Sequence, residues 1–298
     1  MKYLSIGKLW LLVALVGACS GGDPSAEEAC AEYSDRICDS EAKCEPTLID
    51  TTWGSTEICK ERRRLSCPNR FEHQGSNESP GRLVSCAHAL AAMSCDQFLR
   101  PWPDVCVAPE GNLPDGAPCN VWYQCQGGGC NLVQGTCGVC FTTKPAGAAC
   151  VGSDCAVGLS CTAGVCARPG DIELGGECDF GDTCAGALAC IVGTNGSGVC
   201  MNPIPAGGPC YGSGECDITM GLECDLTTSQ CTKLPPLPKA GESCSSSLCN
   251  GSAYCSALGT CMPRGREGAP CDDVAAPCLF PATCVSGKCA LTDPTTCR

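Results

Sequence analysis

Apolar side chains are unevenly distributed along this chain, and only one apolar run is long. Residues 9–18 form an uncharged apolar segment that follows Lys2 and Lys8 and ends in small side chains. A membrane-spanning helix needs about 20 apolar residues, so this run is too short to cross a bilayer. It is typical of a secretory signal peptide, which we place at residues 1–18. No other run approaches this length, so the sequence predicts no transmembrane helix.

Residues 26–110 have the pattern of short helices. Three pairs of cysteines are separated by eight or nine positions: Cys30/Cys38, Cys59/Cys67 and Cys86/Cys95. This spacing is a little over two helical turns, so each pair should lie on one face of a helix. We therefore expect three short helices that are clamped to one another by disulfides, and two antiparallel helices could share two such rungs. Residues 68–82 contain several Pro and Gly and should form an exposed loop.

From residue 111 onward the pattern changes to an internal repeat. Each copy opens with Gly-x-x-Cys and continues with three more cysteines. We place six repeats at about residues 116–140, 147–166, 175–200, 207–231, 241–261 and 268–297. The segments between these cysteines are short and polar, which predicts short strands and turns. Prolines between the copies favour extended spacers. The sequence therefore predicts an elongated array of six small four-cysteine knots.

The composition indicates what must hold such a chain together. There are 35 Cys among the 298 residues, and aromatic residues make up only 5%. Such a cysteine content is typical of disulfide scaffolds, and a chain with few bulky side chains needs cross-links to become ordered. We expect a small disulfide-rich fold, with a braced short-helix domain at 26–110 and the repeats at 111–298. The composition excludes a Rossmann or TIM-type enzyme domain and a multi-span membrane protein, and it argues against a reducing compartment.

Four cysteines in a repeat allow three connectivities. We favour first-to-third and second-to-fourth, because this interlocked arrangement can hold a small two-stranded unit. The expected bonds in the last five repeats are Cys150–Cys161, Cys155–Cys166, Cys178–Cys190, Cys184–Cys200, Cys210–Cys224, Cys216–Cys231, Cys244–Cys255, Cys249–Cys261, Cys271–Cys284 and Cys278–Cys289. Six sets of four leave Cys140 and Cys297 over, and their partners stay open. Cys140 is our candidate for a bond outside its own segment.

Residues 15–19, Leu-Val-Gly-Ala-Cys, resemble the lipobox of bacterial lipoproteins. The resemblance implies cleavage before Cys19 and a diacylglyceryl group on its thiol, with residues 19–25 as a tether. Removing Cys19 leaves 34 cysteines, an even number that can pair completely. Ser20 at the second position implies the outer membrane or cell surface of a two-membrane bacterium. The alternative is ordinary cleavage after Ala18, which would release a secreted protein.

A second resemblance covers residues 119–166. Their cysteines are spaced Cys-x5-Cys-x4-Cys-x6-Cys-x2-Cys-x9-Cys-x4-Cys-x5-Cys-x4-Cys, which is similar to the Dickkopf N-terminal cysteine-rich domain. That family has ten cysteines and this segment has nine, so one of its cysteines should bond elsewhere. The likeness is a cysteine framework and carries over no receptor-binding residue. The whole chain also resembles cysteine-rich exported lipoproteins of bacteria, a family to which we can assign no activity.

The charged residues indicate few partners. Loss of Lys2 and Lys8 with the signal peptide leaves 17 basic and 32 acidic residues, a net charge of about −15. Such a surface repels nucleic acid and anionic membranes. The only basic cluster is Arg62-Arg63-Arg64, which Glu57 and Glu61 flank. We expect it to be a solvated helix face, so no nucleic-acid partner is predicted.

Residues suited to catalysis or metal binding are sparse. His73 falls in the predicted loop and His88 in the third predicted helix, and neither lies near a nucleophile motif, so we predict no enzyme. Cys137-Gly-Val-Cys140 lacks the strand and helix of a redox motif. The usual gaps of four to six residues between cysteines do not match zinc sites. Asp179–Asp182 and Asp272-Asp273 are too sparse for calcium, so no metal and no cofactor is expected.

These observations favour a non-enzymatic cell-surface lipoprotein. Arrays of small repeats present extended surfaces with variable loops, so we expect a binding or adhesion scaffold for proteins or glycans. Its expected partners are the membrane, through acyl chains on Cys19, and one such ligand. Two alternatives stay open: a structural component of the envelope, and a protease inhibitor that presents a rigid loop on a disulfide knot.

Overall fold

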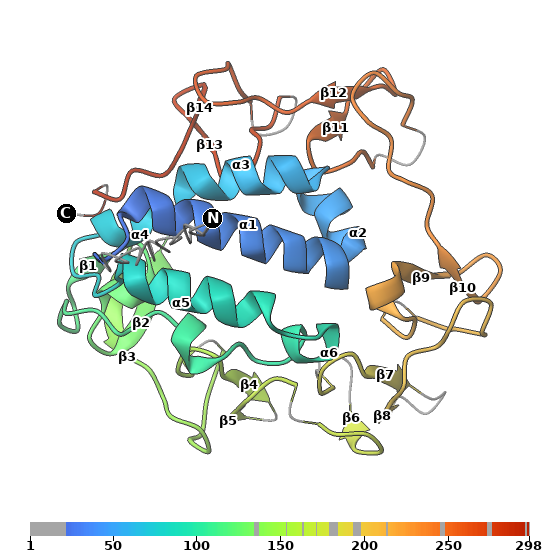
Figure 1. Ribbon diagram of the computed structural model, residues 1–298, viewed down its shortest axis with the longest axis horizontal. Coiled ribbons are helices and arrows are strands. Elements are labelled where there is room, and N and C mark those ends of the chain that lie inside the picture. The colour runs from blue at the N-terminus through green and yellow to red at the C-terminus, as the bar shows by residue number, and fades with distance from the viewer. Residues whose placement is uncertain are drawn as a thin grey trace, which may run out of the picture.

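A computed structural model describes residues 22–133, 137–152, 154–162, 164–170, 172–178, 184–192, 198–212, 214–244, 248–272, 276–295 and 297. The predicted signal peptide, Cys19 and the first part of the tether lie outside the described residues. Helices are concentrated before residue 110, and short strands follow from residue 118. Figure 1 shows the helices at the centre, with the strand pairs arranged around them. We call residues 26–110 the hub and residues 111–297 the ring.

The hub is built on three longer helices. Helix α1 (Ala26–Cys44) packs against both α3 (Thr56–Ser66) and α5 (Pro80–Ala91). Ser25 begins α1 with a capping box, in which its side chain accepts from the backbone N–H of Glu28. Serines also cap α3 and α5. The shorter elements are α2 (Pro46–Leu48), a π-helix (Ile49–Trp53), α4 (Asn69–Glu72), α6 (Cys95–Phe98) and a 3-10 turn (Asp104–Cys106).

Four disulfides brace the hub: Cys30–Cys67, Cys38–Cys59, Cys44–Cys95 and Cys86–Cys106. The first two are rungs between α1 and α3, which run antiparallel. Two details of the predicted helices are wrong. Cys67 caps the end of α3, and Cys95 does not share a helix with Cys86, because Ser94 caps a new helix there. The predicted exposed loop at 68–82 is also wrong in part, since it contains α4 and the buried His73.

The ring consists of small antiparallel sheets, one in each repeated four-cysteine unit. Two sheets have three strands and four have two. The strands are β1 (Pro118–Cys119), β2 (Gly128–Val133), β3 (Cys137–Thr142), β4 (Ser160–Thr162), β5 (Val165–Ala167), β6 (Glu177–Cys178), β7 (Ala189–Val192), β8 (Gly198–Met201), β9 (Leu222–Asp225), β10 (Gln230–Lys233), β11 (Ala253–Cys255), β12 (Cys261–Pro263), β13 (Thr283–Val285) and β14 (Lys288–Ala290). Two cysteines face each other across every hairpin, as Cys161 faces Cys166 in the second repeat. Each of them reaches out to an earlier cysteine of its own unit.

The glycine that opens each repeat has a definite backbone role. In the second repeat Gly147 has φ +81°, and its N–H donates to the carbonyl of Cys166 at 2.8 Å. The five other opening glycines repeat both features, with φ between +78° and +92°. A left-handed φ disfavours residues with a Cβ, so glycine is the natural choice. The Gly-x-x-Cys motif therefore marks the turn that carries the chain back onto its own hairpin.

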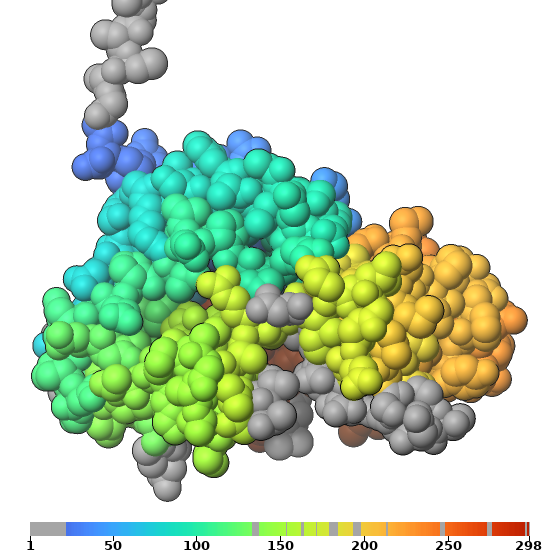
Figure 2. All heavy atoms as spheres, turned by 90° about the horizontal axis from the view of Figure 1, so that it is seen from below, coloured from blue at the N-terminus to red at the C-terminus, as the bar shows by residue number. Residues whose placement is uncertain are grey.

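The repeats do not form the predicted elongated array, because they wrap around the hub (Figure 1). Several contacts tie successive repeats to it: the side-chain amide of Gln124 donates to Gln74 O at 2.9 Å, the backbone N–H of Ala187 to Asp96 Oδ1 at 3.3 Å, and that of Gly251 to Asp50 O at 2.8 Å. A four-cysteine unit buries few apolar side chains of its own, so the hub supplies the surface on which it packs. In Figure 2 the teal hub lies against the green and yellow repeats.

A long-range disulfide closes the ring. Cys137 of the first repeat is bonded to Cys297, across a sequence separation of 160 residues. The expectation that Cys140 bonds outside its segment is wrong, because Cys140 lies opposite Cys130 in the sheet and is bonded to Cys125. Cys119 is bonded to Cys130, so the first unit also follows first-to-third and second-to-fourth once Cys137 is set aside. The ten bonds expected in the later repeats are all present.

Candidate functional site

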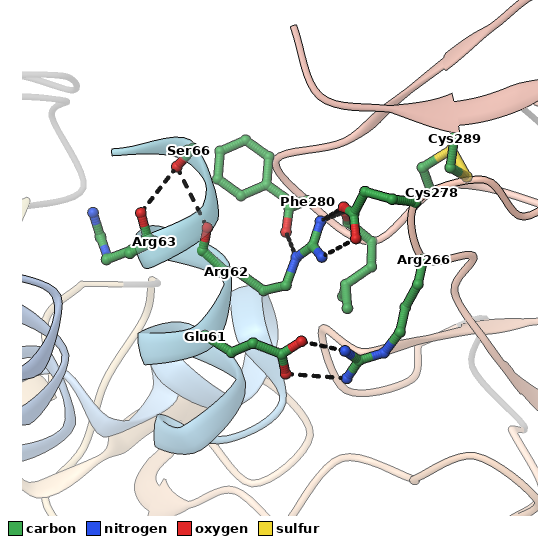
Figure 3. Close-up of polar contacts among 10 residues, drawn as sticks. Glu61, Arg62, Arg63, Ser66, Arg266, Cys278, Phe280 and Cys289 are labelled. Carbon is green, nitrogen blue, oxygen red and sulfur yellow. Dashed lines mark hydrogen bonds and ion pairs between the residues drawn. A yellow bond between two sulfur atoms is a disulfide. The ribbon is translucent and has the colours of Figure 1, made fainter. Parts of the chain in front are cut away.

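Two junctions between the hub and the ring contain charged side chains that are buried or nearly so. The first, which we call the clasp, consists of Glu61 and Arg62 of α3 with Arg266, Glu267 and Phe280 of the last repeat (Figure 3). The Arg62 side chain is fully buried. Its guanidinium binds both carboxylate oxygens of Glu267 and donates to the carbonyls of Phe280 at 2.9 Å and Leu279 at 3.0 Å.

The clasp corrects the expectation for the basic cluster at 62–64, which is not a solvated face. Arg62 is buried because the last repeat lies over it, and the Arg62 hydrogen bond holds the pKa of Glu267 below its usual range. Arg63 stacks over Trp53 at 5.2 Å and pairs with the buried Glu41. Only Arg64 is exposed, and it pairs with Asp35. Arg62 and Arg63 thus contact buried parts of the fold, and Arg64 forms a surface ion pair.

The second junction lies where α4 and α5 meet the first repeat. Glu78, whose side chain is almost fully buried, pairs with Arg70 at 2.9 Å and with Arg82 at 3.7 Å. The Arg70 guanidinium also lies 6.0 Å from the ring of Tyr123. Burial raises the pKa of Tyr123 to about 12, so its hydroxyl stays protonated. One buried carboxylate therefore orients two arginines at this junction.

His73 also contacts the ring of Tyr123. Its ring meets that of Tyr123 edge-on, with 5.6 Å between centroids, and its Nδ1 is 3.4 Å from the carbonyl of Pro294. Burial lowers the pKa of His73. The other histidine, His88, is exposed on α5, 3.5 Å from Glu32. His73 thus connects the hub to the segment that precedes Cys297.

Arg70 and Arg82 also line a groove of about 910 Å³ between the hub and the first two repeats. Its wall is mainly apolar and includes two tryptophans and four prolines. The lining residues are Arg70, Arg82, Pro101, Trp102, Asp104, Cys106, Val107, Ala108, Pro109, Trp122, Pro145, Ala146, Ala156, Val157, Gly158, Leu159, Arg168 and Pro169. Such a volume is within the range of ligand-binding pockets, and a mainly apolar wall with a few polar groups is their usual lining. We take this groove as the candidate site.

Several separate segments of the hub and of the first two repeats position the side chains of the groove. Trp102 is flanked by prolines in the segment after α6; it packs 6.3 Å from Phe98 and keeps 38% of its surface exposed. Trp122 begins a 3-10 turn (Trp122–Gln124) in the first repeat and meets the Tyr123 ring at 5.5 Å. Arg168 is exposed in the spacer after the second repeat. None of these residues was predicted from the sequence to line a site. The local signal that could have pointed to them is the presence of tryptophan in a chain with few aromatic residues.

The cysteine clusters that could suggest metal sites are disulfide-bonded. Cys150, Asp154, Cys155 and Cys166 lie close enough together to share an ion. Their sulfurs, however, belong to the bonds to Cys161 and between Cys155 and Cys166, and a disulfide offers no thiolate to a metal. Asp154 pairs with Lys144 at 2.6 Å.

The structure describes only some of the remaining candidate residues from the sequence. Cys137 and Cys140 are bonded to different partners, so they are not a redox pair. The acidic segment 179–182 and Asp273 lie outside the described residues. Asp272 takes part in a backbone bridge to Ala276.

Comparisons with known proteins complete the description. Searches against protein-family models, curated proteins and solved structures find no match to this chain. Among the helices of the described ranges, none combines the length and apolar character needed to cross a bilayer. The features of this chain that indicate its function are therefore the chemistry of the groove and the cross-linked framework that holds it.

Proposed function

We propose that this chain is an exported surface lipoprotein that binds a ligand in the groove between the hub and the first two repeats. The groove is the observation that carries the proposal, because it joins aromatic and apolar walls to three guanidinium groups. The 17 disulfides support export, since reducing compartments do not keep so many cysteines paired. Anchoring through acylated Cys19, at the outer membrane or cell surface, is the part of the proposal that rests on the lipobox resemblance.

The framework suits binding more than catalysis. Each wall of the groove is cross-linked close by, the hub wall through Cys86–Cys106 and the repeat wall through Cys155–Cys166. A binding surface that is held rigid before the ligand arrives loses less conformational entropy on binding. His73 is buried against Tyr123 and Pro294, and neither it nor His88 is among the described residues that line the groove, so no imidazole is offered to a ligand there.

The binding proposal is tested with the purified mature protein on arrays of glycans and of peptides. We expect at least one class of ligand to bind, and we expect the double variant Trp102→Ala/Trp122→Ala to lose that binding. Tyr211→Ala is the matched control, because Tyr211 is 81% exposed on the fourth repeat, outside the groove. No ligand on either array, or equal binding by all three proteins, would contradict the proposal.

The anchoring proposal has its own test. Intact mass spectrometry of the exported protein should show three acyl chains or a diacylglyceryl group on Cys19, and Cys19→Ser should release the protein from the membrane fraction. An unmodified chain that begins at Cys19 would instead support the secreted alternative.

One observation favours a second function, protease inhibition. Leu258 is 92% exposed in the turn between β11 and β12, and the cysteines on either side of this turn, Cys255 and Cys261, are bonded to Cys244 and Cys249. A rigid braced loop can occupy a protease cleft with little loss of entropy. A panel of secreted proteases assayed with the purified protein separates the two functions, because Leu258→Ala would relieve inhibition and leave groove binding unchanged.

A further inference from the structure

We infer that the ligand of the groove is a carboxylated glycan, an oligosaccharide that contains uronic acid. This inference rests on the binding function proposed above and goes further by naming the class of ligand. Three properties of the groove support it: the charge it presents, the flat apolar surfaces of its wall, and the secondary structure of the segments that line it.

The first property is a local reversal of charge. The chain as a whole is strongly acidic, yet the groove gathers Arg70, Arg82 and Arg168, and among the residues that the structure describes Asp104 is the only acidic one in its lining. Glu78 holds two of these arginines from behind, with its side chain 1% exposed. A guanidinium carries five N–H donors, and the contacts to Glu78 and to the Asp104 carbonyl occupy only some of them. The groove is therefore built to receive an anion, and guanidinium matches carboxylate in shape.

The second property is a wall of flat apolar surfaces. Trp102 and Trp122 contribute indole faces, and four prolines contribute rigid rings. The face of an aromatic ring carries negative partial charge and attracts the weakly positive C–H groups of a partner. A pyranose ring has such a C–H face, with its polar groups at the edge. A uronic acid thus presents an apolar face to the tryptophans and a carboxylate to the arginines.

The third property argues against a peptide that binds by strand addition. None of the described residues that line the groove lies in a strand, so they offer no strand edge to which a peptide could add. The prolines also lack the N–H that such pairing would need. The groove instead offers ring faces and guanidinium groups, and a chain of acidic sugars supplies partners for both.

The inference is tested by titrating the disulfide-intact mature protein with a tetrasaccharide of linked uronic acids, with its neutral glucose counterpart and with tetraglutamate. We expect the uronate tetrasaccharide to bind at least tenfold more tightly than either of the other probes. Its binding should weaken as the salt concentration is raised from 50 to 500 mM. Arg168→Gln should weaken uronate binding about tenfold, which corresponds to one charge-assisted contact. Arg168 is exposed, so its loss should not disturb folding.

The control is Lys233→Gln, which makes the same change of charge on an exposed residue of the fourth repeat and should leave binding unchanged. Equal binding of the neutral sugar, abolished by Trp102→Ala, would overturn the carboxylate requirement and preserve the binding groove. Tighter binding of tetraglutamate would replace the glycan by an acidic peptide. No binding by any probe would overturn the inference alone, since the arrays described above decide separately whether the groove binds anything.

Discussion

The clasp offers the sharpest test of how the ring is held on the hub. Replacing Arg62 by Met keeps an unbranched apolar stem and removes the guanidinium. Four hydrogen bonds are lost, two to Glu267 and one each to the carbonyls of Leu279 and Phe280. Leu279 is buried, and its carbonyl keeps only the backbone N–H of Ala282 as a donor, at 3.1 Å.

The size of the expected loss of free energy follows from how deeply Arg62 and Glu267 are buried. Breaking a buried ion pair by removing one member costs about 3–5 kcal/mol. Here Glu267 keeps 37% of its side chain exposed and can be rehydrated, which places the loss near 3 kcal/mol, the lower end of that range. The repeat is itself braced by Cys271–Cys284 and Cys278–Cys289, so it should detach from the hub without unfolding. A loss of about 3 kcal/mol raises the population of the detached state roughly 100-fold.

Hydrogen exchange read by mass spectrometry measures this opening in fragments that cover α3 and residues 276–290. Arg62→Met should speed exchange there by roughly 100-fold, the change in the open population. The neighbouring pair provides the control. Arg266 and Glu61 are 55% and 44% exposed, and such pairs contribute about 0–1 kcal/mol, so Arg266→Met should change exchange less than about fivefold. Equal effects of the two substitutions would refute the argument that burial of Arg62 decides its contribution.

Three further predictions concern the Cys137–Cys297 disulfide, His73 and the glycine that opens a repeat. The double variant Cys137→Ser/Cys297→Ser should lower the free energy of unfolding by at most about 5 kcal/mol, which is the chain-entropy value for a loop of 160 residues. The loss should be smaller than this value because the disulfides nested inside the loop shorten its free length. Urea titration measures the loss, and an unchanged midpoint would contradict the prediction. Burial lowers the pKa of His73, so the unfolded chain binds more protons: stability should be complete above about pH 6.5 and should fall as the pH drops below it. Melting curves from pH 7.5 to 5 should show this decline, and His73→Gln should reduce it. Gly147→Ala should lower the free energy of unfolding by about 1–2 kcal/mol through its left-handed φ alone, since a Cβ there meets nothing within 4 Å. The control is Gly81→Ala in α5, where a Cβ is equally uncrowded; it should be neutral or stabilising in the same melting experiments.

The features that could be predicted from sequence are those with a local cause. The first-to-third, second-to-fourth pairing follows from a short hairpin that sets two cysteines opposite each other, as Cys224 faces Cys231. Helical spacing also predicts that two antiparallel helices could share two rungs, but it left open which helices pair, and the structure shows that they are α1 and α3. Within a repeat the bonded cysteines are close in sequence, so spacing limits the possible geometry.

The features that could not be predicted depend on contacts between distant segments. Arg62 and Glu267 are separated by 205 residues, and nothing near Arg62 distinguishes it from the exposed Arg64. Choosing Cys137 instead of Cys140 as the closing cysteine requires the register of β2 on β3, which places Cys140 opposite Cys130. The groove is harder still, because its walls come from several separate segments between Arg70 and Pro169 that only the tertiary fold brings together.

These long-range contacts give the arrangement its physical logic. A unit held by two disulfides has little core of its own, as shown by the second repeat, where the partly buried apolar residues described around three buried cysteines are Leu159 and Cys161. Flexible spacers would let such units move independently, and a site made from two of them would have no fixed shape. Packing the repeats on a helical hub and closing the ring through Cys137–Cys297 removes that freedom. A groove between hub and ring is then held at a fixed width by covalent bonds, which is what a binding site needs when few apolar side chains are available to order it.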